Sequence, residues 1–300
     1  MIRAPVPLFG KEGSGEICGV GRVFIIFSHP PGLRGIEFGP AMTIHPTAII
    51  DRKAEIDSDA EIGPYAVIEG AVKIGRGTRV SAHAYLTGWT EIGADNEIYP
   101  GAVLGAAPQD KAYRGQESYL RVGDRNIFRE HVQVHRGTAA GSSTIIGNDN
   151  FLMATAHVGH NSMIADGVIL ANGALLGGHV EVGRGVFLSG HCVVHQFVRI
   201  GDYALMRGLS ATSRDVPPYA IIDWQHTVRG VNVVGLKRAG FDEKRIRAIR
   251  AAFRILFRPG RNLAIALKEV EASGRASDDV TALLDFIRSS KRGVCFGAAD

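Results

Sequence analysis

A six-residue repeat of aliphatic side chains constrains the fold of this chain more than any other feature of its sequence. Every sixth position from Ile146 to Met206 carries an aliphatic residue or Met. An α-helix repeats every 3.6 residues and a β-strand every two, so neither accounts for this period. A period of six predicts a solenoid in which three short strands make one triangular coil of about 18 residues, and the coils stack on one another.

The same phase extends toward the N-terminus as far as Ile44. Of the 28 positions from Ile44 to Met206, only Asp110, Gln116 and Ala140 are not large and apolar. The segment 44–211 therefore predicts roughly nine coils of this kind. The predicted fold is an all-β solenoid, a left-handed parallel β-helix of hexapeptide repeats with a C-terminal α-helical domain.

Composition limits the number of domains and the kinds of partner that the chain can have. The 300 residues allow one or two domains, and a net charge of +4 gives no general reason to expect nucleic acid as a partner. The three cysteines, at positions 18, 192 and 295, form no disulfide framework, which fits a reducing cytoplasm. No apolar run approaches the length of about 18 residues that predicts a transmembrane segment.

The N-terminal segment 1–41 lacks the hexad. It carries Pro30-Pro31 and scattered glycines. Two interpretations compete: a disordered extension, or a start assigned too early, with Met42 as the true first residue. We favour the second because Met42 stands just before the first hexad position, Ile44.

The hexad frame is kept at residues 105–121, but its content changes. Asp110 and Gln116 occupy positions where aliphatic residues belong. An unpaired polar group in such a core costs roughly a few kcal/mol, so we expect the chain to leave the coil here as a loop. Loops on a rigid scaffold often carry function, although a tolerated insertion is the alternative. A weaker break at 139–143 predicts a second loop.

Four histidines are predicted to project from one side of three successive coils. They are His157, His160, His179 and His195, which lie within three positions of Val158, Leu176 or Val194, and those three are one coil apart. A single histidine is more often a packing or surface residue, but four together indicate a site. Imidazole serves as a general base near neutral pH or as a zinc ligand. A γ-carbonic-anhydrase-like zinc enzyme and a non-catalytic solenoid therefore remain alternatives.

Several longer stretches together resemble one family. From about Met42 to the C-terminus the chain resembles the UDP-N-acetylglucosamine O-acyltransferases. The resemblance rests on PQDKAYRGQ in the loop, IFREHVQVHRGT at 127–138, NFLMATAHVGHN at 150–161, LLGGHVEVG at 175–183, VVHQFVRIG at 193–201, RDVPPYAI at 214–221 and GVNVVGLKRAGF at 230–241. It implies transfer of a 3-hydroxyacyl group from acyl carrier protein to the sugar 3-hydroxyl of UDP-N-acetylglucosamine, the first step of lipid A biosynthesis. It also implies that neither a cofactor nor a metal ion is needed. A triangular solenoid has flat sides, and a flat side is a poor pocket by itself, so we predict a homotrimer with the site between neighbouring protomers.

The resemblance also implies roles for single residues. His160 would be the general base and the backbone N–H of Gly178 the oxyanion donor. Gly208 would lie where the acyl groove is closed, and its missing side chain predicts a longer acyl chain. Substrate binding would fall to Gln109, Asp110, His135, His157, His179, His195, Asn232 and Arg238, the last two at the nucleotide end.

Some positions depart from the family pattern. Asn161 stands where many members have an Asp beside the base, which predicts a weaker base. The loop has Lys111-Ala112 where the family's Lys follows one residue later, and Val234 and Ala239 replace frequent Glu and Arg. A sugar nucleotide with a 3-amino group is therefore an alternative acceptor.

The hexad ends near Pro217-Pro218, so we place the β-helix at 42–222 and a helical domain at 223–300. A helical period begins after Phe241 with Asp242 as the expected N-cap, and Pro259-Gly260 ends it. Leu263–Ala272 and Val280–Ser289 predict two further helices, and the helical domain is expected to cap the solenoid. The start of the helical domain is strongly basic. Residues 237–261 contain nine Lys or Arg and only two acids. This charge predicts electrostatic attraction of an acidic partner such as acyl carrier protein, and a solvated basic face is the alternative.

Overall fold

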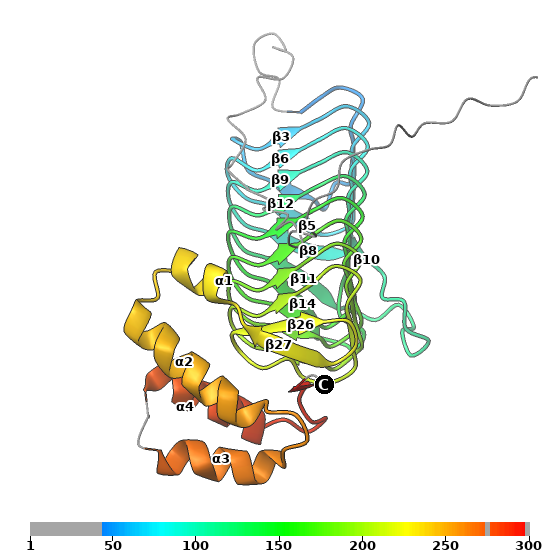
Figure 1. The fold of residues 1–300 in the computed structure, drawn as a ribbon. Helices are drawn as coiled ribbons and strands as arrows, with labels where there is room; N and C mark the ends of the chain where they lie inside the picture. The colour runs from blue at the N-terminus through cyan, green and yellow to red at the C-terminus, as the bar shows by residue number, and fades with distance from the viewer. Residues whose placement is uncertain (1–43, 274–276, 298–300) are drawn as a thin grey trace, which may run out of the picture. The chain divides into compact units, whose positions relative to one another are not determined.

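The computed structural model describes residues 44–273 and 277–297. The predictions for residues 1–41 lie outside this part of the chain. The strands form three sheets, and up to β25 the next strand of each sheet is the third one along the chain. Successive strands therefore wind from sheet to sheet and stack as coils, as Figure 1 shows, and the predicted parallel β-helix of hexapeptide repeats is confirmed.

The strands are short, and most have two residues. Sheet I consists of β1 (Ile49–Ile50), β4 (Val67–Glu69), β7 (Tyr85–Thr87), β10 (Val103–Ala106), β13 (Gln133–His135), β16 (His157–Val158), β19 (Leu175–Leu176), β22 (Val193–Val194) and β25 (Ala211–Thr212). Sheet II consists of β2 (Glu55–Ile56), β5 (Val72–Ile74), β8 (Trp89–Ile92), β11 (Tyr119–Val122), β14 (Ser143–Ile146), β17 (Met163–Ile164), β20 (Glu181–Val182) and β23 (Arg199–Ile200). Sheet III consists of β3 (Glu61–Ile62), β6 (Arg79–Val80), β9 (Glu97–Ile98), β12 (Ile127–Phe128), β15 (Phe151–Leu152), β18 (Ile169–Leu170), β21 (Phe187–Leu188), β24 (Leu205–Met206), β26 (Ala220–Asp223), β27 (Thr227–Val231) and β28 (Phe296–Gly297).

The hexad residues form the core. Val158 pairs in register with Leu176, and Leu176 with Val194, so these three side chains stack as expected. All three are at most 1% exposed. Each coil buries aliphatic side chains against the equivalent residues of its neighbours, which is how a stack of very short strands obtains a continuous hydrophobic core.

Two coils are longer than the regular ones. Leu104 of β10 pairs with Val134 of β13, and Val134 pairs with Val158 of β16. In both pairs the partners are further apart in the sequence than Val158 and Leu176, which are one regular coil apart. The extra residues leave the coil between β10 and β11, at 107–118, and between β13 and β14. Both sites coincide with the breaks that the sequence predicts, and residues 107–118 are called the active-site loop below.

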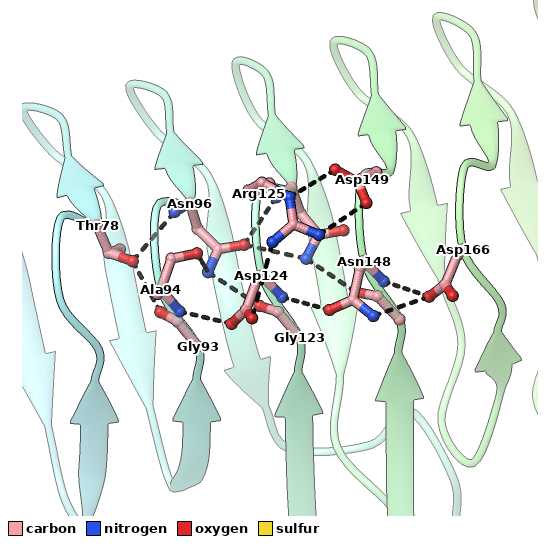
Figure 2. A network of polar contacts seen from close by, with 12 residues as sticks. Thr78, Gly93, Ala94, Asn96, Gly123, Asp124, Arg125, Asn148, Asp149 and Asp166 are labelled. Atoms are coloured by element: carbon pink, nitrogen blue, oxygen red, sulfur yellow. Dashed lines mark hydrogen bonds and ion pairs between the residues drawn. The ribbon is translucent and has the colours of Figure 1, made fainter.

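A ladder of polar side chains holds one corner of the stack, between sheets II and III. Asn126 lies between Asn96 and Asn150: its N–H groups donate to Asn96 Oδ1, and its own Oδ1 accepts from the backbone of Asn150. A second row follows outside it, where the side-chain oxygens of Asp124, Asn148 and Asp166 accept backbone N–H groups of the coil before (Figure 2). These bonds satisfy backbone groups at the turns, where the strand ladders end.

The C-terminal part contains four helices and three strands among the described residues. β26 pairs parallel to β24, β27 returns antiparallel to β26, and β28 pairs with β27. The helices are α1 (Val233–Arg238), α2 (Glu243–Leu256), α3 (Leu263–Ala272) and α4 (Asp278–Arg288). Thus β27 and β28 extend sheet III beyond the predicted β-helix, which the period of the sequence did not predict.

The predicted helices are confirmed. Asp242 caps α2 by accepting the Arg245 N–H, and α3 has the predicted bounds. The fourth helix begins slightly earlier than predicted, after the N-cap Ser277. Arg245 forms a bidentate ion pair with Asp279, both bonds at 2.8 Å, which fastens α2 to α4. Among the described residues, no helix has the length and apolar character that crossing a bilayer requires.

Candidate active site

His160 lies in the turn that follows β16, where sheet I passes into sheet II. Its Nδ1 is 2.9 Å from Thr138 Oγ1 and 3.0 Å from Asn161 Oδ1. Asn161 Oδ1 also accepts the backbone N–H of Thr138 at 2.9 Å, so the oxygen of this amide faces the imidazole. A carbonyl oxygen can only accept, so a hydrogen bond between Nδ1 and Asn161 Oδ1 places the proton of the neutral His160 ring on Nδ1. In the neutral ring, Nε2 is then left with a free lone pair.

Gly178, one coil further on, provides the surface against which this Nε2 rests. A Cβ at position 178 would lie 2.5 Å from His160 Nε2, so a glycine is needed for the ring to take this position. The next residue donates its N–H to His160 O at 2.8 Å and keeps the two turns in register. Within the described residues, no acceptor is paired with the Gly178 N–H. A free lone pair and a free donor thus lie on adjacent coils.

Asp110 reaches the same point from the active-site loop. Its Oδ2 lies 3.9 Å from His160 Nε2. A hydrogen bond from the Ala112 N–H is the main cause that lowers the pKa of Asp110, with smaller contributions from Thr138 and from the neighbouring imidazoles of His160 and His179. Asp110 is therefore a carboxylate at neutral pH, and it faces the His160 imidazole.

His135 and His157 form a second pair on the face of sheet I, with ring centroids 5.1 Å apart. Burial is the main cause that lowers the pKa of both, for His157 to about 4, and their proximity adds to the shift at His157. His135 Nδ1 lies 2.7 Å from Ala107 O, and its Nε2 is buried without a hydrogen-bond partner in the described part of the chain. Two neutral rings, one with an unsatisfied nitrogen, can bind hydroxyl or amide groups of a ligand.

His179 completes the corner. Its ring meets the His160 ring edge to face at 5.2 Å and stacks on Phe197 at 4.6 Å. Asn161, His179 and Phe197 occupy the same position of three successive coils and share a left-handed backbone, with φ near 60°. Burial is again the main cause that lowers the pKa of His179. The stack holds the His179 ring beside the His160 ring.

Comparison with known proteins agrees with this geometry. Residues 53–88 and 143–178 match the family model of bacterial transferase hexapeptide repeats, and residues 215–295 match that of UDP-N-acetylglucosamine O-acyltransferase, domain 2. The acyl-[acyl-carrier-protein]–UDP-N-acetylglucosamine O-acyltransferases of Halorhodospira halophila and of a Janthinobacterium strain are 48% and 45% identical to the chain, over 84% of it and 98% of each relative. The chain belongs to the UDP-N-acetylglucosamine O-acyltransferase family.

Solved structures agree with this assignment. A UDP-N-acetylglucosamine acyltransferase from Bacteroides fragilis superposes with a TM-score of 0.80 at 38% identity, covering 83% of this chain and 98% of that one. The Arabidopsis UDP-N-acetylglucosamine acyltransferase gives 0.76 at 33% identity, covering 84% of this chain and 99% of the other. The similarity therefore spans the β-helix and the helical part together.

The other predicted site residues of this acyltransferase form no hydrogen bond or ring contact with His160 within the described chain. His195 is exposed, with Nδ1 3.1 Å from Gln196 O and 3.3 Å from Arg292. Asn232 uses its amide inside the protein, because Oδ1 caps α1 and Nδ2 donates to Tyr203 O. Gln109, Arg238 and Gly208 are exposed.

The four predicted histidines occupy different positions within their coils. His157 lies on a strand, His160 and His179 lie in turns, and His195 follows the inward residue of a later coil. In residues 44–273 and 277–297, no group of three or more His, Cys, Asp or Glu side chains is arranged to hold a metal ion.

Thr138, which contacts His160 directly, was not among the predicted site residues. It precedes His160 along the chain by more than one regular coil, so a constant coil length gave no reason to place the two together. The available signal was the segment HRGT at 135–138, which directly precedes the second break in the hexad.

Proposed function

We propose that this acyltransferase transfers a 3-hydroxyacyl group from acyl carrier protein to the 3-hydroxyl of UDP-N-acetylglucosamine, the first step of lipid A biosynthesis. The names of the related proteins support the donor and the acceptor. The observation that carries the chemistry is the free Nε2 of His160 next to the unpaired N–H of Gly178 within the described residues. A base and an oxyanion donor this close are what acyl transfer to a hydroxyl requires.

In the proposed mechanism, His160 Nε2 removes the proton from the sugar hydroxyl while its oxygen attacks the thioester carbonyl. The negative charge that develops on the carbonyl oxygen is stabilised by the Gly178 N–H. When the tetrahedral intermediate collapses, the C–S bond breaks and the thiol of the carrier leaves with the proton held by His160. Asn161 and Thr138 keep the ring in the tautomer that this sequence of transfers requires.

The remaining site residues receive substrate roles in this proposal. Asp110 and Gln109 would bind the sugar from the loop, and the neutral rings of His135 and His157 would bind its hydroxyl and amide groups. His179 and His195 would line the acyl path, which Gly208 leaves open. Arg238 and Asn232 would serve the nucleotide end, where a guanidinium suits a diphosphate.

A homotrimer with the site between protomers is part of the proposal, as is a left-handed, cytoplasmic solenoid with domains at 42–222 and 223–300. In support, Leu175 and Val193 continue the register of His157 on sheet I and are 42% and 45% exposed. Apolar side chains beside a shallow polar site are favourable only when another surface covers them. Light scattering tests this, and an active monomer would refute it.

Acyl carrier protein would approach along α2. Lys244, Arg247, Arg250 and Arg254 are exposed at helical spacing along that helix. Such a basic stripe attracts an acidic protein over a distance of about 10 Å at moderate salt. We therefore expect kcat/KM for carrier-bound donor to fall as salt rises, and a flat dependence would count against steering.

The decisive experiment is replacement of His160 by Ala in the purified protein, assayed with UDP-N-acetylglucosamine and 3-hydroxyacyl carrier proteins. Loss of a general base lowers kcat by roughly 10²–10⁴-fold, while the oligomer and sugar-nucleotide binding should persist. His191→Ala, at an exposed turn, is the matched control. Unchanged turnover in His160→Ala would refute the base assignment. Parallel assays with a chelator and with a 3-amino sugar nucleotide separate the zinc and amino-sugar alternatives.

A further inference from the structure

Arg136 is a buried arginine without a carboxylate partner in the described residues. It is only 8% exposed, next to His135 and at the end of β13. Nη1 donates to Gly105 O at 2.6 Å and Nη2 donates to Tyr113 Oη at 2.7 Å, whereas the buried Nε has no partner there. A buried charge with so little compensation is costly, so its persistence calls for a function.

The fold makes a slot for this guanidinium. A Cβ on Gly88 would lie 2.7 Å from Arg136 Nη1, so only a glycine leaves the space. The rings of Trp89 and Tyr113 face Arg136 Cζ at 5.6 and 5.3 Å. A planar cation between aromatic rings is stabilised by cation–π attraction, which a lysine does not reproduce together with two directed hydrogen bonds.

The slot lies at the mouth of the active-site loop. The Arg136 N–H donates to Ala106 O, where the loop leaves the coil, and the N–H of the next residue donates to Tyr119 O, where the loop returns. Gly105, Trp89 and the backbone of Arg136 belong to the rigid stack, but Tyr113 belongs to the loop. The bond from Nη2 to Tyr113 therefore fastens the middle of the loop to the coil.

Tyr113 and Asp110 form one turn. The Tyr113 N–H donates to Asp110 O at 3.1 Å, and the Ala112 N–H donates to Asp110 Oδ1 at 2.9 Å. A fixed Tyr113 hydroxyl therefore fixes the orientation of the Asp110 carboxylate, whose other oxygen stands 3.9 Å from His160 Nε2. The order of contacts runs from Arg136 to Tyr113, to the turn and to Asp110.

We infer that Arg136 is a positioning residue, which holds the turn of residues 110–113 so that Asp110 stands ready for the sugar nucleotide beside the base. The inference rests on the proposed function, because it takes Asp110 as a substrate contact. Arg136 itself touches neither the base nor the expected position of the reacting atoms.

Tyr113→Phe and Arg136→Lys test the inference, with Tyr119→Phe as the control, because that tyrosine bonds Glu117 at the surface. The first readout is tryptic cleavage after Lys111 and Arg114, which are exposed in the loop. We expect both test variants to be cleaved there roughly tenfold faster, because a hydrogen bond to a charged group restrains the loop. Cleavage at the wild-type rate in both would overturn the inference whatever the activity.

The second readout is the split between KM and kcat. If the loop positions Asp110 for the sugar nucleotide, KM for that substrate rises roughly tenfold in both variants while kcat changes little, since His160 and Gly178 are untouched. Faster cleavage with an unchanged KM would overturn the placement of Asp110. If the wild-type protein acylates no UDP-N-acetylglucosamine, the proposed function fails, but the cleavage rates still decide whether Arg136 anchors the loop.

Discussion

Gly178→Ala should inactivate the enzyme by displacing the proposed base. The new Cβ would lie 2.5 Å from His160 Nε2, whereas ordinary contacts begin near 3.4 Å, so the ring must move by about 1 Å. The backbone of Gly178 is not in the left-handed region, and the substitution therefore adds no backbone strain. A displacement of about 1 Å costs roughly 100-fold in rate, or about 2.7 kcal/mol in the barrier.

The assay is kcat/KM with UDP-N-acetylglucosamine and a fixed 3-hydroxyacyl carrier protein, with circular dichroism and light scattering to show that the fold and oligomer persist. Gly190→Ala is the matched control, because its Cβ would meet only Asn172 O at 3.5 Å and should leave the rate within about twofold. A Gly178→Ala enzyme with wild-type kcat/KM would refute the placement of His160 Nε2 against this glycine. A crystal structure of the variant would show which of the bonds from Nδ1 is lost.

Three further changes have predictable outcomes. Asn161→Asp keeps an oxygen for the Thr138 N–H and adds a negative charge 3.0 Å from His160 Nδ1, which favours the imidazolium. The acidic limb of the kcat/KM–pH profile should therefore move to higher pH, and an unmoved limb would contradict this contact. Burial lowers the pKa of His157 from 6.5 to about 4. As the pH falls from 6.5 toward 4, the unfolded chain therefore takes up a proton at this residue before the folded protein does. The free energy of unfolding should fall by roughly 1–2 kcal/mol after discounting for solvent. His157→Gln should remove that loss from urea midpoints measured at pH 7 and pH 5, and an equal loss in both proteins would assign it elsewhere. Gly208→Met fills space where a Cβ meets only Gly190 O at 3.5 Å, so the preference should shift toward shorter 3-hydroxyacyl donors; an unchanged ratio between long and short donors would refute the acyl-length role.

The side chains next to Gly208 bear on that last prediction. Met206 and Arg207 are the neighbours in the chain whose side chains could fill the space beside Gly208. Met206 is fully buried in the core, and Arg207 is turned to Asp223, to which it donates at 2.8 Å. Neither occupies the position of a side chain at 208, which supports an open groove for a longer acyl chain.

The regular coils could be predicted from the sequence because each inward position depends only on its equivalents one coil away. Val158, Leu176 and Val194 stack at the predicted spacing for that reason. The active-site loop was equally predictable, because Asp110 and Gln116 cannot replace aliphatic side chains in such a core. Local polarity was sufficient to show where the chain leaves the coil.

The contacts made by the loops were not predictable. Thr138 and Arg136 lie in a segment whose coils are longer than the rest, so a constant spacing misplaces their neighbours. The path of a loop depends on specific side-chain bonds, such as that between Arg136 and Tyr113, and these have no period. The C-terminal strands β27 and β28 were missed for a similar reason, because they pair with the end of sheet III instead of forming another coil.

The hydrogen bond from the His179 N–H to His160 O has a consequence for how this site tolerates change. It sets the distance between the turn that carries His160, the proposed base, and the turn that carries Gly178, the proposed oxyanion donor, by a main-chain bond. Substitutions in the loop and along the proposed acyl groove can therefore change substrate preference while His160 and Gly178 keep their spacing. We therefore expect sequence divergence within the family to concentrate in the residues that bind the acceptor and the acyl chain. The distance between the turns of His160 and Gly178 should change least.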